Sequence, residues 1–68
     1  MKLSARNQIK GTVAGVQKGQ TTGHVWIDIG NDVMIMASIT NEAIDDLTLA
    51  QGDEAIAVIK ASDVMVAK

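Results

Sequence analysis

Apolar and polar residues alternate along residues 24–29 and again along residues 33–40 of the 68-residue chain. A period of two places successive side chains on opposite faces of an extended backbone, so each stretch is predicted to be a β-strand. Gly30, Asn31 and Asp32 separate the two stretches, and these residue types favour a tight turn. Together the patterns predict a β-hairpin in the middle of the chain.

Three further strands are predicted from shorter or less regular patterns, at residues 8–16, 54–59 and 64–66. The first contains Gly11 and Gly15, which predict a bend or a bulge, because glycine interrupts regular strand pairing. Five short strands, one small helix and no proline predict an all-β fold. The expected architecture is a small five-stranded barrel of the oligonucleotide-binding type (OB-like) with one short helix, and residues 1–68 are expected to form a single domain.

The one predicted helix covers residues 41–47. Thr40 or Asn41 can cap its first turn through a side-chain oxygen. Thr40 has a second interpretation, because a hydroxyl beside the free N–H groups of a helix start can also bind an anion. The polar stretch 18–23 is predicted to be a turn, although its backbone could also contact a ligand.

The two middle strands carry large apolar side chains on their second face as well. Trp26, Met34 and Met36 would project away from the core of a single small barrel. Apolar patches of this kind usually mark protein contacts, so we expect this face to form a subunit interface. The alternative is that the helix at 41–47 covers them. The chain is short and has no cysteine for disulfides, which leaves oligomerisation as the expected source of added stability.

Composition disfavours binding to nucleic acids and to membranes. The formal net charge is −2 and Trp26 is the sole aromatic residue. The chain therefore offers neither a basic surface for phosphate backbones nor a set of rings for base stacking. No apolar run resembles a signal peptide or a membrane span, so we expect a cytoplasmic protein.

No group of residues has the spacing of a catalytic site. His24 has no nucleophilic partner at a recognisable spacing, and Asp45-Asp46 is typical of a solvated helix surface. The sequence also contains no glycine-rich loop of the Walker or dinucleotide-binding type. The chain is therefore predicted not to be an enzyme, and His24 is expected to have a packing or surface role.

Two short runs near the ends of the chain combine a cation with a hydroxyl: Ser4-Ala5-Arg6-Asn7-Gln8 and Lys60-Ala61-Ser62. Arginine, lysine and serine supply N–H and O–H donors, and neither run contains an acid. Converging them would replace the water shell of a small tetrahedral dianion with charge-assisted hydrogen bonds. The alternative is that the cations are solvated charges at strand ends. The working hypothesis is an oxyanion site.

Motifs along essentially the whole chain resemble those of the molbindins, a family of small molybdate-binding proteins. They are S-A-R-N-Q at 4–8, G-x-V at 11–13, V-x-x-G at 16–19, V-x-I-x-I-G at 25–30, A-S-I-T at 37–40, L-x-L-x-x-G at 47–52 and I-K-A-S-D-V at 59–64. The pairing of the first motif with I-K-A-S is specific to the family, and both match without departure. The resemblance implies an OB-like fold that assembles into a hexamer, a trimer of dimers, with oxyanion sites at subunit contacts.

The resemblance also implies a ligand and the residues that hold it. The ligand is molybdate, or tungstate, kept for storage and homeostasis inside the cell. The implied binding residues are Ser4, Arg6, Thr40, Lys60, Ala61 through its backbone N–H, and Ser62. All of them would donate hydrogen bonds to oxygen atoms of the anion, so no protein group is expected to coordinate the metal directly.

Two other functions stay open as alternatives. The same domain occurs in molybdate-responsive regulators and in molybdate transporter ATPases, so the chain could be a sensing module that acts through a partner protein. A small OB-type nucleic-acid binder is the third hypothesis, and charge and aromatic content disfavour it.

A binding site made only of donors has a predictable selectivity. It favours full dianions such as molybdate, tungstate and sulfate over hydrogen phosphate, whose O–H would face another donor. Asp63 is the one nearby acceptor that could weaken this preference. Selection of molybdate over sulfate is expected to come from the size of the cavity.

Overall fold

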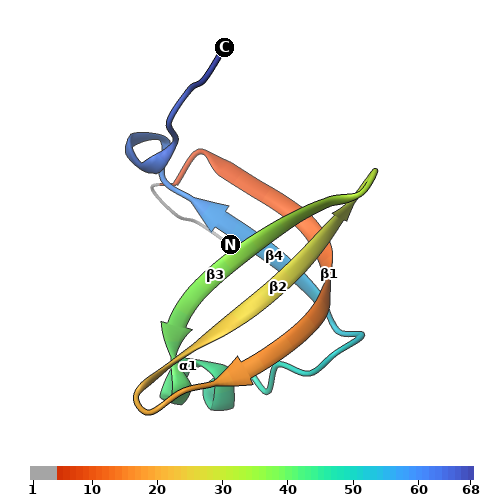
Figure 1. Cartoon of the computed structure of the whole chain (residues 1–68), viewed down its shortest axis with the longest axis vertical. Coiled ribbons are helices and arrows are strands. Elements are labelled where there is room, and N and C mark those ends of the chain that lie inside the picture. Colours follow the sequence, from red (N-terminus) through yellow and green to blue (C-terminus); the bar gives the residue numbers. More distant parts are fainter. Residues whose placement is uncertain (1–4) are drawn as a thin grey trace.

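The computed structural model describes residues 5–68, which form a strongly curled sheet with a short helix at one end (Figure 1). The elements, in chain order, are β1 (Asn7–Lys18), β2 (Thr22–Gly30), β3 (Val33–Thr40), α1 (Asn41–Asp46), β4 (Glu54–Ile59) and the 3₁₀ turn η1 (Ala61–Asp63). The first four predicted strands and the predicted helix are confirmed, with ends shifted by at most two residues. No helix in this range is long and apolar enough to cross a membrane.

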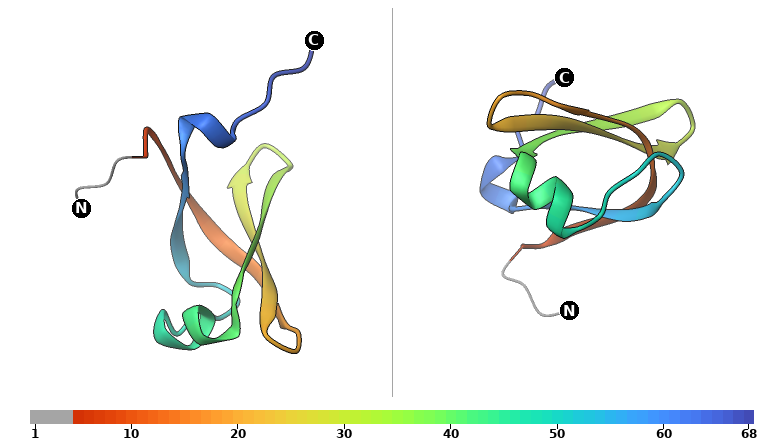
Figure 2. Two further views of the ribbon diagram at one scale, coloured as in Figure 1. Left: turned by 90° about the vertical axis from the view of Figure 1, so that its left-hand side faces the viewer. Right: turned by 90° about the horizontal axis from the view of Figure 1, so that it is seen from below.

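Over the described residues the strands form one antiparallel sheet in the order β3-β2-β1-β4. β1 holds the sheet together, because its first half pairs with β4 and its second half pairs with β2. The register against β2 shifts between Val13 and Gly15, which is the predicted bulge. A Cβ at Gly11 would lie 2.6 Å from Ile27 Cγ2 and 2.7 Å from the Asp28 carbonyl oxygen. Glycine therefore lets β1 pass close to β2 while the sheet curls into a half-barrel (Figure 2).

The turn between β2 and β3 has the conformation that its sequence favours. Asn31 and Asp32 both have left-handed backbones, with φ of 53° and 61°. Two consecutive left-handed residues are typical of a type I′ turn, whose twist matches that of a hairpin. The Asp28 carboxylate accepts a hydrogen bond of 2.8 Å from the Gly30 N–H. This turn fixes the register between the two strands.

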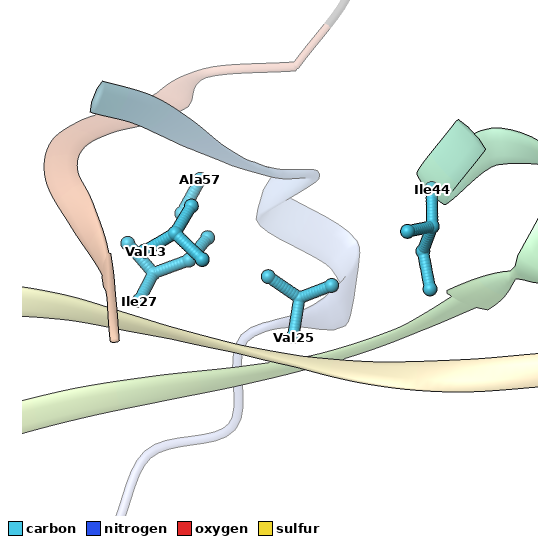
Figure 3. Packing of buried hydrophobic residues seen from close by; sticks show 5 residues of the cluster. All are labelled: Val13, Val25, Ile27, Ile44 and Ala57. Atoms are coloured by element: carbon cyan, nitrogen blue, oxygen red, sulfur yellow. The ribbon is translucent and has the colours of Figure 1, made fainter. Parts of the chain in front are cut away.

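The core lies inside the curl of the sheet. Its buried members among the described residues are Val13, Val25, Ile27, Ile44 and Ala57 (Figure 3). They come from β1, β2, α1 and β4, and α1 closes the lower end of the half-barrel in Figure 1 through Ile44, which is 2% exposed. A core this small supports the expectation that one copy alone is marginally stable.

The predicted closing strand at residues 64–66 is not formed. η1 follows β4 instead, with hydrogen bonds from Asp63 N–H to the Lys60 carbonyl and from Val64 N–H to the Ala61 carbonyl. This turn sends the chain out beyond the end of the barrel, as Figure 1 and the left panel of Figure 2 show. The described sheet thus has four strands rather than five, while the all-β, OB-like class with one short helix is confirmed.

The outer face of β2 and β3 is apolar, as predicted. Met34 and Met36 are exposed, and Trp26, which is paired with Met36, is half-buried. The ring of His24 packs edge-on against the ring of Trp26, with 5.9 Å between the ring centroids. Trp26 is therefore partly covered within its own chain. α1 lies at the end of the barrel with Ile44 in the core, so it does not cover this face.

Candidate oxyanion site

The register between β1 and β4 brings the two ends of the described chain together. Asn7 pairs with Ile59, 52 positions later in the sequence. Arg6 directly precedes this pair on one strand and Lys60 directly follows it on the other. Because the strands are antiparallel, both cations lie at the same end of the sheet. We call Arg6 together with residues 60–62 the cationic end.

The side chain of Asn7 reinforces this pairing. Its Nδ2 donates a hydrogen bond of 3.1 Å to the carbonyl oxygen of Ile59. The bond fixes the backbone immediately before Lys60, on the strand opposite Arg6. Sequence reasoning included Asn7 in a motif but gave it no role, since its partner becomes visible only once the register is known.

Residues 60–62, the second part of the cationic end, lie where β4 gives way to the 3₁₀ turn η1. Lys60 has an extended backbone, with φ −64° and ψ 142°, and the turn starts directly after it. The N–H groups of Ala61 and Ser62 have no acceptor among the described residues, as expected for the first residues of a helical turn. Ala61 and Ser62 are exposed, so this turn lies on the surface of the protein.

The two cations of this end are exposed and lack partners within the described part of the chain. Neither Arg6 nor Lys60 forms a salt bridge or a side-chain hydrogen bond with residues 5–68. Asp63, the acceptor noted in the sequence, is part of η1 and its carboxylate also has no partner there. The arrangement offers two full positive charges and several N–H and O–H donors to an anion.

Thr40 lies at the other end of the sheet. It pairs with Thr22, next to the pair of Lys18 with Gly23, at the far end of β1 from Asn7. β1 has twelve residues, a contour of roughly 36 Å at about 3.3 Å per step, so even a curled strand holds its two ends much further apart than the width of one small anion. Thr40 therefore cannot contact the same anion as Arg6 and Lys60 of its own chain. Ser4, the remaining predicted ligand, lies outside the described residues.

The helix end, meaning Thr40 and α1, uses its polar groups within the chain. Thr40 Oγ1 accepts a hydrogen bond of 3.0 Å from Ala43 N–H and so caps α1, which was one of its two interpretations. Asn41, the other candidate cap, instead donates through Nδ2 to the Gly19 carbonyl at 2.9 Å. The Thr40 hydroxyl keeps its own proton free to donate, because a cap uses only its oxygen lone pair.

The polar stretch before β2 packs against the helix end. Gly19 N–H donates to the Thr22 carbonyl at 2.9 Å, which closes a tight turn, and Lys18 forms an ion pair with Asp45 of α1. This supports the interpretation of the stretch as a turn. His24 has the packing role expected of it, against Trp26. Within residues 5–68 no three His, Cys, Asp or Glu side chains group together as they would around a metal ion.

The fold and the cationic end define a class: a small OB-like β-protein with two cations at one end of its sheet that have no partner within residues 5–68. Comparison with known proteins agrees. The family model described as TOBE domain matches residues 3–66. A probable molybdenum-pterin-binding protein of Haemophilus influenzae is 44% identical over 66 residues, which cover 97% of this chain and 96% of that protein.

Two solved structures have the same fold. A molybdate-binding protein from Sporomusa ovata has a TM-score of 0.93 at 34% identity, with both chains fully covered. The cytoplasmic molybdate-binding protein ModG, solved with molybdate bound, has a TM-score of 0.90 at 38% identity, and the match covers 96% of this chain and 46% of ModG. The chain belongs to the TOBE domain family and, within it, to the molybdenum-pterin-binding (Mop) proteins, or molbindins.

Proposed function

We propose that this protein binds molybdate at the cationic end and so holds the anion for storage and homeostasis. The observation that carries the proposal is the β1–β4 register, which brings Arg6 and Lys60 to the same end of the sheet with neither cation paired within residues 5–68. The names of ModG and of the Sporomusa ovata protein, both molybdate-binding, support the choice of ligand. Tungstate has the same charge and the same tetrahedral oxygens, so it is expected to bind as well.

The binding residues on this proposal are the six that the family resemblance implies. Arg6, Lys60, Ser62 and the Ala61 N–H act from the cationic end, and Ser4 joins them from the preceding segment. Two cations balance the charge of the dianion, while hydroxyl and backbone donors fix its oxygens. All of this is hydrogen bonding to oxygen, so the protein carries out no reaction on the anion and is not an enzyme.

Thr40 completes the site from a second copy. If Thr40 is a ligand, it must act from another copy, because its own chain holds it at the opposite end of the sheet from the cationic end. An oligomer is further supported by the small core and by the exposed Met34 and Met36 on the outer face. In a hexamer built as a trimer of dimers, symmetry would repeat the contact between the cationic end of one copy and Thr40 of another. We place the protein in the cytoplasm, as ModG is described.

Calorimetric titration with four anions tests the function. We expect molybdate and tungstate to bind well, sulfate weakly and phosphate hardly at all near neutral pH, because the site contains only donors. A single-stranded oligonucleotide in the same buffer serves as the control for the disfavoured OB-type alternative. Equal affinity for molybdate and phosphate would contradict the donor-only site.

A further inference from the structure

Asn41 is tied to the turn before β2 through two separate groups. Its backbone N–H donates to the Thr21 carbonyl oxygen, and its side-chain Nδ2 donates to the Gly19 carbonyl oxygen, both at 2.9 Å. The Gly19 N–H in turn donates to the Thr22 carbonyl at 2.9 Å, so both acceptors of Asn41 lie on a closed turn. Two hydrogen bonds in different directions hold a residue more firmly than one does, because rotation about the first breaks the second.

These bonds act directly on Thr40, which precedes Asn41 in the chain. The backbone of Thr40 ends β3 and pairs with Thr22 of β2. Thr40 is thus held by the β2–β3 ladder on one side and by Asn41 on the other. Its hydroxyl oxygen is fixed in addition by the cap to the Ala43 N–H, at 3.0 Å. All of these contacts restrict the position of the hydroxyl, the one group of its side chain that can donate a hydrogen bond.

The other half of the Asn41 amide does not stabilise a single copy. Its Oδ1 is buried and has no hydrogen-bond partner within residues 5–68. A buried acceptor without a donor is destabilising, because it has lost its hydrogen bonds to water. An apolar side chain of similar size would avoid this penalty, and the carbonyl of the exposed Gly19 would then bind water. Stability of the fold alone therefore does not explain an asparagine at position 41.

A second connection between the same two segments lies further along the helix. Lys18 forms an ion pair with Asp45, and the two side chains are 47% and 61% exposed. An exposed ion pair contributes little to stability. Asp45 follows Asn41 by about one turn of α1, on the side away from Thr40. This ion pair therefore connects α1 to the turn without acting on the residue next to Thr40.

We infer that Asn41 is a positioning residue for molybdate: by tying the chain directly after Thr40 to the turn at residues 19–22, it holds the Thr40 hydroxyl where it donates to the anion. This inference rests on the proposed function, in which Thr40 acts from a second copy. Asn41 does not touch the anion itself, because its Nδ2 is used by Gly19 and its Oδ1 is buried. A donor that is already held in place loses less conformational entropy on binding than one that moves freely.

Asn41→Leu tests this role, because leucine is close to asparagine in size and has no hydrogen-bonding group. We expect molybdate affinity, measured by calorimetry, to fall about threefold to tenfold. A residue that acts only through Thr40 cannot cost more affinity than loss of the Thr40 donor itself, so a larger loss than that of Thr40→Asp would overturn the inference. The unfolding midpoint in urea should stay near the wild-type value, since the unpaired buried acceptor is removed together with the bond to Gly19. If Asn41→Leu lowers the midpoint, Asn41→Ala takes its place in every comparison, because alanine favours the helix and introduces no clash.

The double variant Lys18→Ala/Asp45→Ala is the matched control. It removes the ion pair between the same two segments and leaves the net charge unchanged. We expect its molybdate affinity to stay within about twofold of the wild-type value. A loss as large as that of Asn41→Leu would show that any loosening of α1 weakens binding, which would overturn a specific role of Asn41.

A double-mutant cycle shows whether Asn41 acts through Thr40. Thr40→Asp keeps a cap for α1 and removes the hydroxyl donor. In that background Asn41→Leu has no donor left to misplace, so it should change molybdate affinity by less than about twofold. A purely structural role of Asn41 would instead give losses that multiply. The double variant would then be weaker than Thr40→Asp by the same factor that separates Asn41→Leu from the wild type, and the inference would be wrong.

The proposed function and this inference fail through different results. If the wild-type protein does not bind molybdate, the proposed function is wrong and the inference falls with it. If the wild type binds molybdate and Asn41→Leu binds it equally well, the proposed function stands and Asn41 has a structural role only.

Discussion

The two ends of this half-barrel differ in how they use polar groups. At the helix end, Thr40, Asn41 and Lys18 all have partners within the chain: a capped N–H, a backbone carbonyl and the Asp45 carboxylate. At the cationic end, Arg6 and Lys60 have none within residues 5–68. Folding gives partners to most polar groups of the first end and leaves the two cations of the second without a partner within residues 5–68. The difference fits a helix end organised for stability and, on the proposed function, a cationic end organised for an external anion.

Removing the anchor of the helix end should have the largest effect on stability. Ile44→Ala deletes the one fully buried side chain of α1 and leaves a cavity, so we expect the free energy of unfolding to fall by about 2–4 kcal/mol. Urea denaturation followed by Trp26 fluorescence measures this. Asp46→Ala, at an exposed position of the same helix, is the matched control and should change stability by less than about 0.5 kcal/mol.

Removing either cation should affect binding and not folding. Arg6→Ala or Lys60→Ala deletes a charge-assisted contact to the dianion, which is expected to cost about 1.5–3 kcal/mol of binding free energy, or more than tenfold in affinity. Calorimetry with molybdate measures the loss. Lys10→Ala removes an exposed cation elsewhere on β1 and should leave affinity unchanged. A variant of Arg6 or Lys60 that binds at the wild-type strength would remove that residue from the site.

Thr40 allows its two roles to be separated. Aspartate is a good N-cap, so Thr40→Asp should keep α1 intact while it replaces a donor with a negative charge. We expect molybdate affinity to fall about tenfold or more, while the unfolding midpoint in urea stays near the wild-type value. Thr40→Ser retains both the cap and the donor and is the matched control. Full affinity in Thr40→Asp would leave Thr40 with the capping role alone.

The Asn7 clamp should have the smallest effect. Asn7→Ala removes one partly buried hydrogen bond to the β4 backbone, which is expected to cost about 0.5–1.5 kcal/mol of stability. It should also weaken molybdate binding by a few-fold, because Lys60 is held less firmly. Gln8→Ala, at the next and exposed position of β1, controls for the change in side-chain size. Equal effects of the two substitutions would show that Asn7 positions nothing.

Much of the fold could be predicted from local patterns. Alternation located the hairpin strands, and the turn residues Asn31 and Asp32 located the bend between them. The fifth strand could not be judged this way. Residues 64–66 are apolar enough for a strand, but whether they pair depends on the direction in which η1 sends the chain. That direction is a property of the assembled backbone and not of the segment.

The candidate site shows the same division. The donor chemistry of Arg6, Lys60 and Ser62 was readable from residue types, and the register that joins them was not. Whether Thr40 acts from the same chain or from another stayed open for a related reason. The motif shows that the Thr40 hydroxyl can donate a hydrogen bond. The strand order, which the motif does not show, places Thr40 at the opposite end of the sheet from Lys60.

The pairing of Asn7 with Ile59 also has a consequence for the order of folding. The β2–β3 hairpin closes across a two-residue turn, whereas β1 and β4 must close a loop that spans most of the chain. Closing the longer loop costs more chain entropy, so this pairing forms late. On the proposed function the anion contacts both cations together, so it would bind only the completed sheet. By mass action, molybdate at about a hundred times its dissociation constant would raise the free energy of unfolding by about 2.7 kcal/mol. Bound molybdate would therefore stabilise the protein against unfolding.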